Sequence, residues 1–200
     1  IPGFAAGTWV RYYVQAAAAN TSKSVSYMPA GAEHNVFIYT IAPNASGDTS
    51  IVINEVMASN VTTAADNFGE YDDWVELYNK SAVAVDISGY TLTDNPVNLD
   101  KWTFPTGTII QPNDYLIVWA DEDSSQGPYH MNFKLSAAGE ILMLLDVANN
   151  VVDSLGWGLQ IADQGLARVP NGTGNFVIQG PTFSANNNSV GLNEDISLPV

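Results

Sequence analysis

Short runs of alternating apolar and polar residues, separated by turn-forming residues, dominate this chain. The run from Thr8 to Ala16 alternates over a full strand length and places Val10, Tyr12 and Val14 on one face. Such alternation is typical of β-strands, whereas the spacing of an amphipathic helix is nowhere sustained over ten residues. The pattern therefore predicts an all-β protein.

The same alternation predicts further strands along the chain. They cover residues 25–28, 35–41, 51–56, 73–79, 83–87, 90–93, 108–110, 115–120, 140–145 and 151–155. Asn149 and Asn150 tolerate the positive φ angles of a tight turn, so a hairpin is expected to join the last two strands. Strands that recur at this pace are typical of a β-sandwich. In the strand at 73–79, Val75 and Leu77 are expected on the buried face, with the other face open.

Breaker-rich residues at 42–50 predict a linker, which divides the chain into segments. Residues 1–41 form an N-terminal β segment, 51–187 the main domain and 188–200 a C-terminal linker. The chain starts at Ile1-Pro2-Gly3 without an initiator methionine, and this start is expected to lie inside a longer precursor.

The main segment carries a series of motifs in a fixed order. They include Ile53-Asn54-Glu55-Val56, Asp73-Trp74-Val75-Glu76-Leu77-Tyr78-Asn79, Val85-Asp86-Ile87-Ser88-Gly89-Tyr90-Thr91-Leu92, Trp102-Thr103-Phe104-Pro105, Val151-Val152-Asp153, Leu166-Ala167-Arg168-Val169-Pro170 and Gly180-Pro181-Thr182-Phe183. Through these motifs, residues 51–187 resemble the lamin tail domain, which is also found in bacterial secreted proteins. The resemblance implies an immunoglobulin-like β-sandwich in which Asp73 and Glu76 hold structural roles at a strand edge.

Residues 1–41 resemble the closing strands of a preceding immunoglobulin-like or fibronectin-like domain, on the run Gly7 to Val14. A piece of two or three strands is marginally stable alone. We therefore expect this segment to pack against the main domain. The C-terminal linker resembles the one that precedes a sorting signal in secreted proteins of the Bacteroidetes group.

The charge balance restricts the possible partners. Six Lys and Arg residues stand against 21 Asp and Glu residues, which gives a formal net charge of -15. Binding to nucleic acid or to an anionic membrane requires the opposite sign, so neither is expected as a partner. No long apolar run is present, so membrane insertion is not expected. The low charged fraction of 14%, with Asn, Ser, Thr and Gly as the polar residues, is typical of secreted or cell-surface β-domains.

Few residues could support catalysis. The chain has no cysteine, which excludes disulfides and thiolate metal sites. Its two histidines, His34 and His130, are predicted in exposed loops, away from any nucleophile motif. No catalytic residue and no cofactor is therefore expected, and the protein is predicted not to be an enzyme.

Acidic clusters are the remaining candidates for a site. Asp66, Glu70, Asp72 and Asp73 lie within eight residues, and Asp121, Glu122 and Asp123 follow a predicted strand. Several carboxylates on one loop suit calcium, and paired carboxylates can act as acid and base in a hydrolase. A solvated acidic surface is the third interpretation and the leading one, because the whole protein is acidic.

The five tryptophans (Trp9, Trp74, Trp102, Trp119 and Trp157) fit either the core or a sugar-binding surface, and their size favours the core. The function predicted is a non-catalytic accessory module that docks, spaces or anchors a neighbouring domain of a larger secreted or cell-surface bacterial protein. Its partner would be that neighbour, another protein or a polysaccharide. The alternative is a carbohydrate- or calcium-binding module.

Overall fold

The computed structural model describes residues 5, 8–19, 25–28, 37–40, 45 and 47–189 of the 200-residue chain. Within these residues the regular elements are β-strands, apart from a short 3-10 helix, η1 (Asn187–Ser189). None of the described residues belongs to a helix long and apolar enough to cross a membrane. The all-β prediction is therefore confirmed.

The larger of two facing sheets has six strands. In spatial order they are β12 (His130–Met131), β11 (Tyr115–Ala120), β6 (Asp73–Asn79), β5 (Ile51–Met57), β15 (Gly165–Val169) and β16 (Asn175–Gln179). Neighbouring strands are antiparallel except for β11 and β12, which run parallel. This order places β5 and β6, which carry the first two motifs, at the centre of the sheet.

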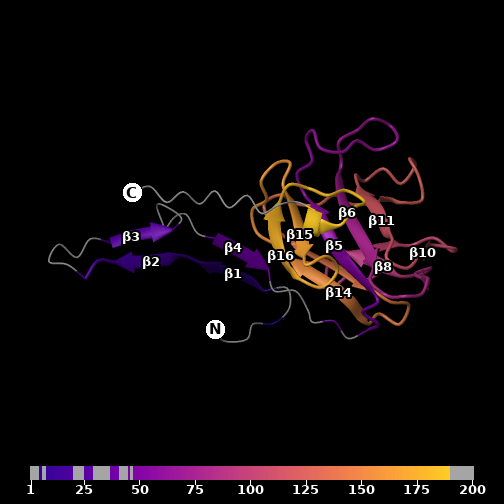
Figure 1. The fold of residues 1–200 in the computed structure, drawn as a ribbon, viewed down its shortest axis with the longest axis horizontal. Helices are drawn as coiled ribbons and strands as arrows, with labels where there is room; N and C mark the ends of the chain where they lie inside the picture. The colour runs from indigo at the N-terminus through magenta and orange to yellow at the C-terminus, as the bar shows by residue number, and fades with distance from the viewer. Residues whose placement is uncertain are drawn as a thin grey trace.

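The second sheet has four antiparallel strands and covers one face of the first. Its spatial order is β14 (Val151–Gly156), β13 (Ile141–Leu145), β8 (Thr91–Thr93) and β9 (Trp102–Thr103). A separate pair, β7 (Val85–Asp86) and β10 (Ile109–Ile110), completes the described part of this domain. The two large sheets form the predicted sandwich (Figure 1).

The core lies between these two sheets, where inward-facing side chains of both form one buried cluster. Ile53 and Leu77 of the six-stranded sheet share that cluster with Leu92, Leu142 and Leu144 of the four-stranded sheet. All five side chains are fully buried. Burial of so many large aliphatic side chains is the main stabilising contribution to the fold.

A polar link also crosses the sandwich. Asp153 of β14 accepts hydrogen bonds from the Ile53 backbone N–H at 2.8 Å and from Arg168 Nη2 at 2.8 and 2.9 Å. Arg168 of β15 in turn donates through Nε to the Ile53 carbonyl at 2.8 Å. One carboxylate and one guanidinium therefore tie three strands of the two sheets together.

Strand β6 differs from its predicted burial. Trp74, Val75, Glu76 and Leu77 are all fully buried, so both faces of the strand are covered rather than one. The outer face is covered because the chain returns over it after β16, where the ring of Phe183 packs at 5.2 Å from that of Trp74. The expectation of a strand-edge role for Glu76 was wrong, since β6 is flanked on both sides by other strands.

Turns follow the predicted chemistry. Asn149, between β13 and β14, adopts a φ of 61°, as expected for the Asn-Asn hairpin. Gly89 adopts a φ of 77° before β8, which confirms the glycine turn of the third motif. Both positions use residues that tolerate left-handed backbone conformations.

The N-terminal strands form a two-stranded ribbon, called the arm below. It consists of β1 (Trp9–Tyr12), β2 (Val14–Ala17), β3 (Val25–Met28) and β4 (Phe37–Thr40). β1 pairs with β4 and β2 with β3, both antiparallel. Figure 1 shows β2 and β3 extending away from the sandwich, so the packing predicted for this segment does not include those two strands.

Candidate functional site

The loop between β5 and β6 carries the predicted acidic cluster, and Asn60 shapes its course. The Asn60 amide nitrogen donates to the carbonyls of Ala64 at 2.6 Å and Asp72 at 2.8 Å. Asp163 holds the start of the loop by accepting from the backbone N–H groups of Val61 and Thr62. These hydrogen bonds lower the pKa of Asp163, so it stays ionised and keeps the loop folded at neutral pH.

Asp66 folds the acidic part of the loop back on itself. Its Oδ1 accepts from the backbone N–H groups of Phe68 and Glu70, both at 2.8 Å. Gly69 completes the turn with a φ of 84°, a value that other residues rarely adopt. The turn brings Glu70 next to Asp66 even though they are four residues apart.

Three of the four predicted ligands converge. One ligand oxygen from each of Asp66, Glu70 and Asp72 lies within 4.8 Å of the other two. Asp73 is not in this group, because it starts β6 and its Oδ1 accepts from the Asn60 N–H at 3.3 Å. Burial raises the pKa of Asp73 to about 6.

Several oxygens at this site have no donor. Asp66 Oδ2 and Asp72 Oδ2 are buried atoms without a hydrogen-bond partner among the described residues, and so is Oε1 of Gln126. Gln126 reaches the cluster from the loop after β11, where its Nε2 donates to Glu70 Oε2 at 2.6 Å. Oxygen acceptors without a protein donor are able to bind a cation.

The pKa of Asp72 indicates repulsion within the acidic cluster. Burial raises the pKa of Asp72, and the negative charges of Asp121, Glu70 and Asp66 raise it further. A cation would relieve this repulsion. The group offers oxygen ligands only, which is the chemistry preferred by Ca²⁺. The three carboxylates would leave the remaining positions of a calcium ion to other protein oxygens and water.

His130 is not the exposed loop residue that was predicted. It lies in β12, is only 5% exposed, and its Nδ1 contacts Asp121 Oδ2. The pairing of β12 with β11 sets His130 opposite Trp119, and the ring of Phe68 packs edge-on at 6.1 Å. Asp121 is thereby occupied and does not join a second acidic cluster with Glu122 and Asp123. The other histidine, His34, lies outside the described residues.

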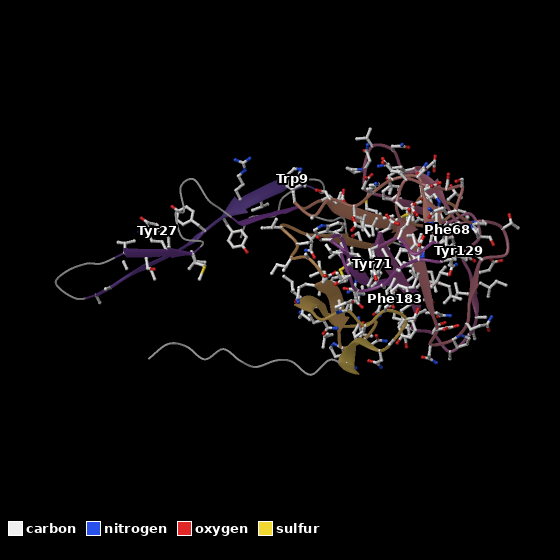
Figure 2. All side chains as sticks on the ribbon, turned by 90° about the horizontal axis from the view of Figure 1, so that it is seen from above. Trp9, Tyr27, Phe68, Tyr71, Tyr129 and Phe183 are labelled. Atoms are coloured by element: carbon white, nitrogen blue, oxygen red, sulfur yellow. The ribbon has the colours of Figure 1, made fainter. Side chains whose placement is uncertain are left out.

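Gln126 is the site residue that sequence reasoning missed. An isolated glutamine in a polar loop gives no signal, because its position depends on how the loop after β11 meets the loop before β6. The two loops meet where the Phe68 ring packs against His130, which directly follows Tyr129; Figure 2 labels Phe68 and Tyr129 on the sandwich.

Comparison with known proteins decides the family. Residues 29–159, more than half of the chain, match the Lamin Tail Domain family. The chain belongs to the lamin tail domain family. As a family, lamin tail domains are immunoglobulin-like and non-catalytic. The match starts within the N-terminal segment, whereas the motifs identified from the sequence begin at residue 51.

Two further comparisons add little to this assignment. A search of curated protein sequences finds no match to this lamin tail domain. Among solved structures, it is similar to the crystal structure of a DUF4876 family protein from Bacteroides thetaiotaomicron, with 12% sequence identity and a TM-score of 0.37. That similarity covers 90% of this chain and 81% of the other.

Most tryptophans of this lamin tail domain are buried in the interior, as predicted. Trp74, Trp102, Trp119 and Trp157 are buried, and Trp9 on the arm is 53% exposed. A hollow of about 220 Å³ lies beside β5 and β15, and Lys80, Asp153 and Arg168 are among the residues that line it. Its one carboxylate is bound by Arg168. The hollow therefore lacks the pair of carboxyl groups that an acid–base hydrolase needs.

Proposed function

We propose that this lamin tail domain is a non-catalytic accessory module of a larger secreted or cell-surface bacterial protein, and that it docks a neighbouring domain of the same precursor through its arm. The observation that supports this is the exposure of large apolar side chains on the arm. Trp9, Tyr12, Tyr13, Val14 and Met28 are each at least 45% exposed. A two-stranded ribbon with such side chains gains stability from a covering surface.

The distribution of charge supports the arm as the docking element. Of the 21 Asp and Glu residues, only Glu33 precedes residue 47, so the acidic residues concentrate on the sandwich. A partner that approaches the sandwich meets a strongly negative surface, whereas the arm offers a nearly neutral one. Protein interfaces are depleted in charge at their centre and enriched in Tyr and Trp.

Hydrogen exchange in this chain and in the full-length precursor tests the proposal. If a neighbouring domain covers the arm, backbone amides of 9–17 and 25–28 should exchange at least about tenfold more slowly in the precursor. Amides of β5 and β6 serve as the internal control and should exchange equally in both proteins. A Trp9→Ser, Val14→Ser double variant of the precursor should lose the extra protection. Equal exchange of the arm in the two proteins would contradict the proposal.

A second candidate function is calcium binding at the Asp66, Glu70, Asp72 and Gln126 group. The observation in its favour is the three buried oxygens without a donor. A cation there would join the loop before β6 to the loop after β11 and stabilise the sandwich at that end. In this role calcium would be structural, and it would leave the docking function to the arm.

Calorimetric titration with calcium chloride, together with thermal melting with and without a chelator, tests this candidate. Micromolar binding and a rise of several degrees in Tm are expected, because a ligand that binds only the folded state stabilises it. Asp72→Asn should abolish both effects. Asp100→Asn removes one exposed carboxylate outside the group and should change neither. Absence of heat and of any Tm shift in the unaltered chain would exclude the site.

A further inference from the structure

Residues 180–188, called the strap below, cross the outer face of the six-stranded sheet. The Thr182 hydroxyl donates to Glu55 Oε2 at 2.7 Å, and the Ser184 N–H donates to Glu76 Oε2 at 2.7 Å. Between them, Phe183, which is labelled in Figure 2, packs against the rings of Trp74 and Trp119, with centroids at 5.2 and 5.6 Å. The strap thus holds the sheet through two glutamates and one aromatic ring.

The two glutamates are close neighbours. Glu55 on β5 is paired in register with Glu76 on β6, so both side chains project from the same face of the sheet. Both are fully buried. Gly165 on β15 leaves the room that this requires, because a Cβ at that position would lie 2.0 Å from Glu55 Oε1.

No positive charge compensates this pair among the described residues. From β11, Ile117 is paired with Glu76, and Tyr115 lies nearby; burial is the main cause that raises the pKa of the Tyr115 hydroxyl, with smaller effects of Tyr78 and Glu76. From β15, the neighbours are Gly165 and Ala167. The strap itself contains no charged residue, and its Asn187 bonds to neutral groups.

Two ionised carboxylates cannot share such a site without strong repulsion, so the pair retains a proton. The pKa of Glu76 is raised to about 8: burial is the main cause and the charge of Glu55 adds to it, whereas hydrogen bonds from Asn54 and from the Ser184 N–H lower it. Burial likewise raises the pKa of Glu55, and it outweighs the hydrogen bonds from the Thr182 hydroxyl and N–H, which lower it. The pair therefore changes its charge close to neutral pH.

We propose that the strap is a pH-controlled latch, which stays docked while the Glu55–Glu76 pair holds a proton and lifts from the sheet when both carboxyl groups are ionised. The surface uncovered is the apolar cluster of Met57, Trp74 and Trp119, on which Phe183 packs. That surface is apolar and aromatic, and it is available only in the open state.

The strap lifts while the sandwich stays folded, because the contacts that hold its two ends do not involve the titrating Glu55–Glu76 pair. At its far end, Asn187 Nδ2 donates to the carbonyls of Asn54 and Arg168, which do not titrate. At its near end, β16 remains paired with β15. The core between the two sheets lies on the opposite face of β5 and β6, away from the carboxyl groups of Glu55 and Glu76. The segment between the two anchors opens as a loop.

The sign of the pH effect follows from the raised pKa of Glu76. Its value is about 8 in the folded protein, against a usual value of 4.5. The stabilisation that protonated Glu76 gives to the docked strap is fully present below the usual value and is lost as pH rises through about 8. The latch is thus closed in acid and open in base.

Acrylamide quenching of tryptophan fluorescence from pH 5 to pH 10 tests the latch, in a Trp9→Phe background that removes the exposed indole. The Trp9→Phe protein with both glutamates intact should show a rise in quenching with a midpoint near pH 8, as Trp74 and Trp119 become accessible. Glu76→Gln, which stays neutral and keeps an acceptor for Ser184, should remain weakly quenched throughout. Far-UV circular dichroism should be constant over the same range.

Two control variants make the outcome specific. Glu140→Gln removes a half-buried glutamate, whose pKa burial raises to about 7 but which accepts from the Ser136 N–H rather than from the strap; it should leave the transition unchanged. Phe183→Ala should give high quenching at every pH, which shows that the probe detects the strap. Flat quenching in the unaltered pair, or the same transition in Glu76→Gln, would overturn the proposal.

Discussion

Replacing Leu77 by alanine is expected to reduce the free energy of unfolding by about 2–5 kcal/mol, which is the usual range for a fully buried leucine in a packed core. Leu77 is completely buried and lies on β6, between β5 and β11 in the larger sheet. Its side chain belongs to the cluster between the two sheets, where neighbouring strands leave little freedom to close the cavity. Urea unfolding followed by circular dichroism measures the loss.

Leu159→Ala provides a matched control for this prediction. It makes the same chemical change at a side chain that is 77% exposed, and it should alter the free energy of unfolding by less than about 0.5 kcal/mol. Equal losses in the two variants would mean that the sheets do not pack as described.

Asp153→Ala is expected to destabilise the protein by about 3 kcal/mol, because it leaves the Arg168 guanidinium without its counter-charge in a largely buried position. The side chains of Asp153 and Arg168 are 11% and 17% exposed. The substitution also removes the acceptor of the Ile53 N–H, a buried backbone donor at the centre of the sheet. Thermal and urea unfolding should both register the change.

The control for this second prediction is Asp94→Ala. Asp94 pairs with Lys101 at 2.6 Å, and the side chains are 15% and 28% exposed. Water solvates the lysine that remains, so the loss should stay below about 1 kcal/mol. A loss from Asp153→Ala no larger than that from Asp94→Ala would show that the link between the sheets contributes little.

The sequence predicted those parts of the fold that depend on local patterns. Alternation identified most strands, including β5, β6, β11, β13 and β14, and the Asn149 turn was expected from its residue type. Strands β15 and β16 were not predicted as strands, because neither Gly165–Val169 nor Asn175–Gln179 alternates regularly between apolar and polar residues. The double burial of β6 was also missed, since it depends on the strap more than 100 residues further along the chain.

The candidate cation site was also predicted only in part, namely for the residues that are close in sequence. Asp66, Glu70 and Asp72 are close in sequence, and a hairpin-like turn of Asp66 is enough to bring them together. Gln126 and the buried His130 belong to another loop and another strand, and a sequence pattern contains no information about where that loop meets the first. The Glu55–Glu76 pair escaped notice because register, rather than sequence spacing, makes the two residues neighbours.

The antiparallel pairing of the arm has a mechanical consequence. Trp9 is paired with Thr40 at the base of the arm, and Ala17 with Val25 near its tip. A pulling force between the chain before Trp9 and the sandwich would therefore break the paired residues of the arm one pair at a time, beginning at the base. Strands that separate in this way do so at low force, because the whole force acts on one pair of residues at a time. Under tension the arm would lengthen as an extensible tether while the sandwich stays folded.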